Sequence, residues 1–180
     1  RLALQNYERL REFSPDRAES PALLSYEGIQ YQHMAPSVFT DTQWDYVCRH
    51  LRILSGFYGI LSPTDRVIPY RLEMHAKLPL LGYQDLYAFW GDRLARALCA
   101  QTDFILNLAS LEYSRAVLPH LPKGVRVLTC SFGELKDGKV IEKGTLCKMA
   151  RGEMVRFLAE KGIARPEEMK TFNRLGYTYS

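Results

Sequence analysis

The stretch LSGFYGILSPTDRVIPYRLEMH, residues 54–75, decides how this chain of 180 residues is interpreted. Gly56, Gly59, Pro63 and Pro69 interrupt any helical or strand period, yet the stretch is too apolar for a loose loop. Its backbone groups and charged side chains must therefore find partners on the rest of the protein. Because ordered irregular backbone of this kind usually serves binding or chemistry, we expect the functional site here.

The composition favours one folded domain with a modest excess of positive charge. Hydrophobic residues make up 47% of the sequence and aromatic residues 12%, as is typical of a chain with a packed core. The net charge of +4 permits an acidic partner without requiring one. We expect a single domain over residues 1–180, trimmed at both ends, and a cytoplasmic protein, because neither a signal peptide nor a membrane span is visible.

The cysteines and histidines do not form a recognisable metal or disulfide pattern. Cys48, Cys99, Cys130 and Cys147 stand far apart without a CxxC pair, which favours buried, reduced thiols over disulfides or a zinc site. His75 is a candidate base or metal ligand, but no matched partner lies near it in the sequence. We therefore expect no metal and no cofactor.

Periodicity on either side of the central stretch predicts a mixture of helices and strands. Before it we expect a helix over residues 1–13, a strand over 22–26, and a helix from Thr40 or Thr42 to about Leu54. After it we expect helices over 84–100, 110–118 and 148–161, a short helix from Pro166, and apolar strands over 104–108 and 125–132, the first buried on both faces. Asp137-Gly138 predicts a hairpin. The order indicates an α/β (mixed α+β) fold, with a mixed sheet and an antiparallel hairpin flanked by helices.

Two glycines at residues 55–60 suggest an anion site. Gly56 and Gly59 can expose successive backbone N–H groups to phosphate, and Arg52 precedes them. A helix cap followed by a tight turn explains the same spacing. The stretch is neither a Walker loop nor a dinucleotide fingerprint.

Paired charges and a glycine within a helical pattern extend this candidate site. Arg71 and Glu73 stand two residues apart, which suits either a structural ion pair or an anion and proton site. Trp90 and Asp92 flank Gly91, where glycine costs about 1 kcal/mol relative to alanine and suggests close approach by another element.

Polar residues after a strand and basic residues at a helix start complete the set. Asn107, Ser110 and Tyr113 follow a predicted buried strand, where polar groups often line a cleft, although Ser110 is equally explained as a cap. Lys148 and Arg151 open a predicted helix against its dipole. Contact with an anion explains these two residues, and so does a solvated face.

Taken together, the chain resembles the YaaA family of bacterial peroxide stress resistance proteins. The matching stretches are LRILSGFYGILSPTDRVIPYRLEM (51–74), DLYAFWGD (85–92), NLAS-x-EY (107–113), KMARG (148–152) and F-x-x-x-GY (172–177). The resemblance implies a cytosolic protein that limits hydrogen peroxide damage, associated with lowered free iron. It also implies double-stranded DNA binding through a positively charged cleft and a helix–hairpin–helix-like element, best matched here by residues 55–60 and the preceding helix.

The expected function is DNA binding with little sequence preference during oxidative stress. The residues expected to bind DNA phosphate are Arg52, Ser55, Gly56, Tyr58, Gly59, Arg66, Arg71, Lys148 and Arg151. The residues expected to line the cleft are Tyr70, Glu73, Trp90, Asp92, Asn107, Ser110 and Tyr113. The alternative is an enzyme acting on a small phosphorylated or nucleotide-like ligand, with Glu73 or Asp92 as the base.

Overall fold

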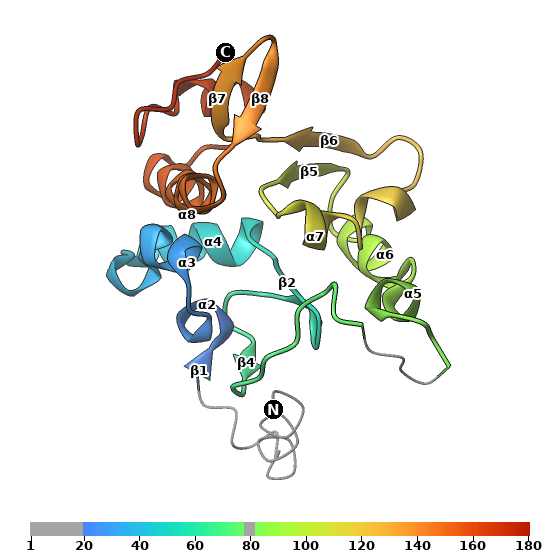
Figure 1. The fold of residues 1–180 in the computed structure, drawn as a ribbon. Coiled ribbons are helices and arrows are strands. Elements are labelled where there is room, and N and C mark those ends of the chain that lie inside the picture. Colours follow the sequence, from blue (N-terminus) through green and yellow to red (C-terminus); the bar gives the residue numbers. More distant parts are fainter. Residues whose placement is uncertain (1–19, 78–81) are drawn as a thin grey trace. The chain divides into compact units, whose positions relative to one another are not determined.

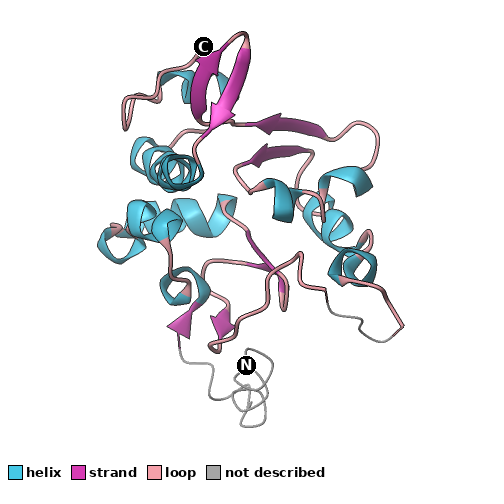
Figure 2. Cartoon of the chain, viewed as in Figure 1, coloured by secondary structure: helices cyan, strands magenta, loops and turns pink. Residues whose placement is uncertain are grey.

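The computed structural model describes residues 20–77 and 82–180, in which groups of helices and groups of short strands follow one another (Figure 1, Figure 2). In chain order they are β1 (Ser20–Pro21), α2 (Ala22–Ser25), α3 (Ile29–Met34), η2 (Pro36–Val38), α4 (Asp41–His50), β2 (Ile53–Ser55), β3 (Gly59–Leu61), β4 (Arg66–Val67), α5 (Leu86–Trp90), α6 (Arg93–Cys99), β5 (Phe104–Asn107), α7 (Leu111–Ser114), η3 (Leu118–His120), β6 (Arg126–Thr129), β7 (Gly133–Lys136), β8 (Lys139–Glu142), α8 (Gly144–Lys161) and η4 (Pro166–Thr171), where η marks a 3₁₀ helix. The expected mixed α/β fold is confirmed, but the expected mixed sheet is wrong, because the described strands form separate two-stranded sheets.

The described residues group by their contacts into two compact units. Unit 1 contains Ser20–Pro21 and Arg52–Cys130, and unit 2 contains Ala22–Leu51 and Ser131–Ser180. Lys148 and Arg151 belong to unit 2, whereas the other residues expected at the site belong to unit 1. The single domain expected over residues 1–180 stays a prediction.

The strands pair into four two-stranded sheets within the described residues. The pairs β1–β4, β2–β3 and β7–β8 are antiparallel, and β5–β6 is parallel. The predicted hairpin is confirmed, because β7 and β8 pair on either side of Asp137 and Gly138, whose φ angles are 50° and 73°. Positive φ at both central positions gives a turn whose twist matches that of the strands.

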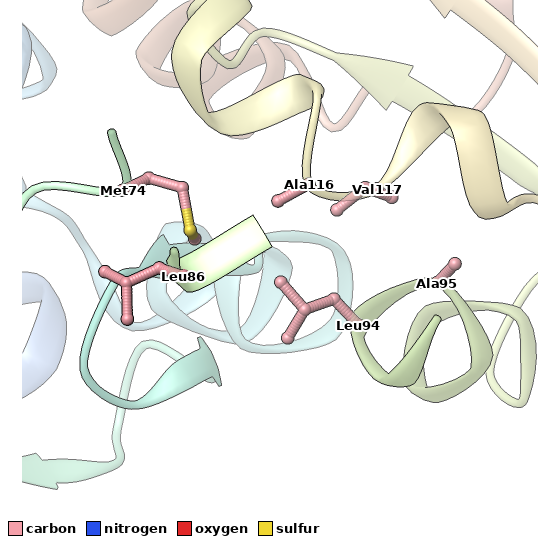
Figure 3. Close-up of a cluster of buried hydrophobic side chains, with 6 residues drawn as sticks. All are labelled: Met74, Leu86, Leu94, Ala95, Ala116 and Val117. Carbon is pink, nitrogen blue, oxygen red and sulfur yellow. The ribbon is translucent and has the colours of Figure 1, made fainter. Parts of the chain in front are cut away.

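Six buried side chains form a core in unit 1. They are Met74 from the irregular segment, Leu86 from α5, Leu94 and Ala95 from α6, and Ala116 and Val117 after α7 (Figure 3). Met74 is 0% exposed, and burial of such a side chain contributes roughly 1.5–3 kcal/mol. The irregular segment is therefore anchored to α5 and α6.

Helix α8 forms the centre of unit 2, with α3 packed along it (Figure 1). At Gly152 of α8, a Cβ atom would lie only 2.1 Å from the backbone oxygen of Gln30 in α3. The absence of a side chain there lets the two helix backbones approach closely. The helix ends at Gly162, as predicted, because its φ of 60° suits a left-handed C-cap.

Two boundaries before the central stretch differ from the prediction. The strand expected over residues 22–26 is wrong, because Ala22–Ser25 forms α2, and a short apolar run does not by itself distinguish strand from helix. Helix α4 is capped by Thr40, one of the two predicted caps, but it ends at His50 instead of about Leu54. Strand β2 then buries Ile53 and Ser55 in a hairpin, which ends the helical pattern.

The helix expected over residues 84–100 is divided at Gly91. Its φ of 52° and ψ of −129° end α5, and α6 begins at Arg93. A Cβ atom on Gly91 would come no nearer than 3.8 Å to the oxygen of Ala88. The backbone conformation, and not close approach by another element, therefore explains this glycine.

Later boundaries also shift. Helix α7 is shorter than expected, and α8 begins four positions before Lys148. Strand β5 is confirmed, but its expected burial on both faces is wrong, because Phe104–Leu106 is half-buried and β6 is exposed. Each of these strands has one partner strand among the described residues, so the outer edge of each strand is not covered by another described strand. Pro166 begins a short helix, as predicted, and the helix expected over 1–13 lies outside the described residues.

The cysteines are free thiols. Their predicted burial is confirmed for Cys147 and is wrong for the other three, which are half-buried. In the described parts of the chain, 20–77 and 82–180, we find no helix with the length and apolar character needed to cross a membrane.

Candidate functional site

Ser55 fixes the tight turn between β2 and β3. Its Oγ atom accepts hydrogen bonds from the backbone N–H groups of Phe57 and Tyr58, at 3.1 and 2.8 Å. The hydroxyl oxygen of Tyr70 lies 2.5 Å from the same atom. Because the two N–H donors occupy both lone pairs of the serine oxygen, the Ser55 hydroxyl donates its proton to Tyr70. Ser55 is 1% exposed, so this network joins the turn to the irregular segment inside unit 1.

The two glycines of the turn are packing positions. A Cβ atom on Gly56 would lie 2.7 Å from the backbone oxygen of Leu72. Gly59 has a φ of 80°, and its Cβ atom would lie 2.8 Å from the ring of Trp90. Trp90 also donates its indole N–H to the Gly56 carbonyl at 3.0 Å. Close packing explains both glycines, and the N–H groups between them already bind Ser55.

Residues 55–60 form the turn of a β-hairpin, so the helix–hairpin–helix element is not found at its expected place. Ile53 pairs with Leu61 across β2 and β3. Beyond Leu61, the described residues up to Lys77 contain no helix. Instead, the Asp65 carboxylate accepts the backbone N–H of Ser62 at 2.8 Å, which turns the chain into β4.

Strand β4 pairs with β1, and side-chain contacts hold the rest of residues 62–77 in place. The backbone N–H of Ile68 donates to the hydroxyl of Tyr58 at 3.1 Å, and Ile68 is buried. The rings of Phe57, Tyr58 and Tyr70 contact one another, with centroid distances of 4.8, 5.3 and 5.4 Å. Together with the anchor at Met74, these contacts make the segment a fixed support.

Two predicted arginines project from this support into solvent. Arg66 is exposed at the start of β4, and the side chain of Arg71 is 65% exposed. The Nη2 atom of Arg71 lies 3.5 Å from Oε1 of Glu73, whose side chain is also more than half exposed. Because an exposed ion pair contributes only about 0–1 kcal/mol, a phosphate group can compete with Glu73 for this guanidinium.

Arg52 is half-buried beside Gln101. Its Nε and Nη2 atoms donate to Oε1 of Gln101, at 3.1 and 2.6 Å. These contacts hold the guanidinium beside the end of α6.

The two predicted cations of unit 2 differ in exposure. Lys148 is exposed on α8, whereas Arg151 is 7% exposed. Arg151 donates to the carboxylate of Glu142 at 3.1 Å, and its Nε has no hydrogen-bond partner among the described residues. Arg151 thus lies inside unit 2. Its burial does not fit the surface contact with phosphate that the sequence predicted.

The residues expected to line a cleft have separate partners in unit 1. Asp92 forms an ion pair with Arg96, one helical turn away, at 3.3 Å. Asn107 is 8% exposed, donates its side-chain amide to Thr129 at 3.2 Å, and accepts the backbone N–H of Ala109 at 3.1 Å. It therefore joins β5 to β6 and shapes the turn that follows β5.

The remaining two cleft residues lie at α7. Ser110 occupies the N-cap position, but its side chain makes no capping hydrogen bond within the described structure. Tyr113 packs against the core cluster of unit 1. The sequence correctly places Ser110 at the start of a helix, but its side chain does not form the cap that the simpler interpretation predicted.

Glu112 is absent from the predicted site, yet it contacts His75. The Nδ1 atom of His75 lies 2.7 Å from Oε1 of Glu112, and the backbone N–H of His75 donates to the same oxygen at 3.2 Å. The hydrogen bond to Glu112 and its charge raise the pKa of His75 above the ordinary 6.5, and the charge of Glu73 acts in the same direction. Two sequence signals could have pointed to Glu112: it stands in the matched stretch NLAS-x-EY, and it is an acidic residue in the first turn of a helix.

Comparison with known proteins identifies the family. The chain matches the family described as "Peroxide stress protein YaaA" over residues 1–180. The chain belongs to the YaaA family. A UPF0246 protein of Desulfitobacterium hafniense is 55% identical over 178 residues, which cover 99% of this chain and 71% of the relative. UPF0246 proteins of Lachnoclostridium phytofermentans and Agathobacter rectalis are 54% and 48% identical, over 99% of this chain and 70% and 72% of the relatives.

The sequence motifs had indicated this family, and the family assignment is confirmed. Two surface hollows of this YaaA-family chain lie in unit 2: one of about 230 Å³ beside the start of α8, and one of about 550 Å³ beside α2 and α3. None of the predicted site residues lines either hollow. The described residues also contain no group of three or more His, Cys, Asp or Glu side chains that could hold a metal ion.

Proposed function

We propose that this YaaA-family chain acts in the peroxide stress response by binding double-stranded DNA with little sequence preference. The observation that carries the proposal is the exposure of Arg66 and Arg71 on a segment fixed by Tyr58, Tyr70 and Met74. Guanidinium groups bind phosphate with charge-assisted hydrogen bonds, and phosphate contacts carry no sequence information. A fixed pair of arginines therefore supports affinity for the duplex backbone without a choice of bases.

The charge around these arginines supports moderate, salt-dependent binding. Glu73 partly neutralises Arg71, and the net charge of the whole chain is only +4. Each phosphate neutralised contributes about −0.9 to the slope of log affinity against log salt, so Arg66 and Arg71 give about −1.8. If exposed Lys148 also binds a phosphate, the slope becomes about −2.7.

Protection of DNA follows from occupancy of the duplex. A bound protein covers the backbone where iron and hydrogen peroxide generate hydroxyl radical, and so limits strand breakage. The proposal places the protein in the cytoplasm, together with the DNA. It is tested by counting nicks in plasmid DNA exposed to iron(II) and hydrogen peroxide, with and without the protein.

The binding step is tested by fluorescence anisotropy with a duplex of mixed sequence at several salt concentrations. Arg71→Ala should weaken binding and reduce the magnitude of the salt slope by about 0.9. Arg126→Ala is the matched control, because Arg126 is also in unit 1, its side chain is 70% exposed, and it also faces a carboxylate, 3.9 Å away on Asp103. The control should bind like the wild type.

Three results would contradict the proposal. They are wild-type binding that does not respond to salt, no binding to a duplex, and an equal loss in the Arg71 and Arg126 variants. Tight binding of a mononucleotide without binding of a duplex would instead favour an enzyme acting on a small phosphorylated ligand.

A further inference from the structure

His75 has a carboxylate near each of its ring nitrogens. Oε1 of Glu112, in α7, lies 2.7 Å from Nδ1 and also accepts the backbone N–H of His75 at 3.2 Å. Oε2 of Glu73 lies 3.9 Å from Nε2. A single oxygen of Glu112 thus holds both the ring and the backbone of a residue 37 positions away in the chain.

This arrangement suits the protonated form of the ring. An imidazolium donates from both nitrogens, whereas a neutral imidazole donates from only one. The hydrogen bond that the His75 ring donates to Glu112 and the negative charge of Glu112 raise the pKa of His75, desolvation opposes them, and the charge of Glu73 adds to the rise. His75 therefore keeps its proton to a higher pH than an ordinary histidine does.

Glu73 is shared between His75 and Arg71. It lies 3.5 Å from Nη2 of Arg71 on one side and 3.9 Å from His75 on the other. Among the described residues, Tyr87 donates to the Glu112 backbone oxygen at 2.9 Å, and Arg115 lies over the Tyr87 ring at 5.5 Å. The charge of Asp85 acts on Tyr87, and exposed Lys77 follows His75 by two positions in the chain. A proton on His75 attracts Glu73 and so weakens its hold on Arg71.

We propose that Glu112, His75 and Glu73 form a proton-operated latch, in which a proton on His75 fixes residues 72–77 against α7 and draws Glu73 from Arg71 toward His75, which strengthens the attraction between Arg71 and phosphate. The second half of this inference rests on the proposed function. When the pH rises through the raised pKa of His75, the proton is lost and Glu73 again neutralises Arg71. Affinity for phosphate therefore falls as the pH rises.

The latch itself is tested without DNA, by NMR titration of the histidine ring protons. His75 should titrate at a higher pH in the wild type than in Glu112→Gln, which removes the charge but keeps the size of the side chain. The ring protons of the exposed His120, in η3, serve as the internal reference when the two proteins are compared. Equal titration of His75 in the two proteins would overturn the latch.

The coupling to Arg71 is tested by duplex affinity at about pH 6 and about pH 8, at constant ionic strength. On lowering the pH, the wild type should gain about two- to five-fold more affinity than His75→Gln, in keeping with the strength of an exposed ion pair. Glu73→Gln should bind more tightly at both pH values and lose the additional gain. An equal pH dependence in the wild type and His75→Gln would overturn the coupling. Absence of duplex binding at both values would overturn the proposed function and the coupling, while the NMR titration still decides the latch.

Discussion

Replacing Gly152 by alanine has two opposite effects on stability: it improves helix propensity and it worsens packing. In the interior of an α-helix, alanine is favoured over glycine by about 1 kcal/mol. In this structure, however, the new Cβ atom would lie 2.1 Å from the oxygen of Gln30 and 3.0 Å from the backbone nitrogen of Met34. Ordinary contact begins near 3.4 Å, so α3 and α8 would have to separate by roughly 1.3 Å, the difference between 3.4 and 2.1 Å.

The two effects give a net destabilisation. Overpacking a core costs about 1–3 kcal/mol, and the upper end applies here because backbone atoms cannot rotate away. After subtraction of the propensity gain, we expect a loss of about 2 kcal/mol in the free energy of unfolding and a fall of about 4–8 °C in Tm. Urea unfolding followed by far-UV circular dichroism measures this loss.

A second glycine of the same helix supplies the control. A Cβ atom on Gly144 would meet nothing within 4 Å, so Gly144→Ala should be as stable as the wild type or slightly more stable. If Gly152→Ala keeps the stability of the wild type, or gains with the control, the close approach of α3 to α8 is refuted.

Two other substitutions test a hydrogen bond and an ion pair. Trp90→Phe removes the indole donor to the buried Gly56 carbonyl, which should cost about 1–3 kcal/mol and lower the urea midpoint; an unchanged midpoint contradicts the contact. Burial raises the pKa of Glu160, but hydrogen bonds from Arg156 and Arg174 outweigh it and hold the pKa below the ordinary 4.5. Because the folded-state pKa is lowered, its contribution to stability is present above about pH 4.5 and is lost as the pH falls through the folded pKa. Glu160→Gln should therefore lower the urea midpoint at neutral pH and reduce its fall in acid, and an acid profile identical to the wild type would count against the ion pair.

The sequence predicts those elements whose signals are local. Thr40 caps α4 through Gln43, three positions away, and Asp137-Gly138 closes its hairpin within two residues. Gly162 ends α8 by its own backbone conformation. In each case the deciding interaction lies within a few positions, where propensity and turn chemistry act.

The central stretch depends instead on partners that no periodicity encodes. Ser55 reaches Tyr70 across 15 positions, and Trp90 reaches Gly56 across 34. The glycines and prolines show that the stretch is folded against something, but they do not show against what. Phosphate binding and a helix cap followed by a tight turn both favour glycine, so the residue type left these two interpretations open at residues 55–60. Neither included the close packing against Leu72 and Trp90 that the structure shows.

The sequence also does not predict which basic side chains are exposed. Arg151 and Lys148 stand three positions apart on α8, yet the first is buried against Glu142 and the second is exposed. A basic residue signals charge, while the tertiary packing decides whether that charge faces solvent or a carboxylate.

Hydrogen exchange at the Ile68 amide tests most directly whether residues 62–77 form a fixed support for the arginines. This amide is buried and donates to the Tyr58 hydroxyl at 3.1 Å. We expect it to be protected in the wild type, and its protection to fall about five-fold in Tyr58→Phe, which corresponds to a hydrogen bond of about 1 kcal/mol. Exchange of Ile68 in the wild type at the rate of an unstructured peptide would contradict the account.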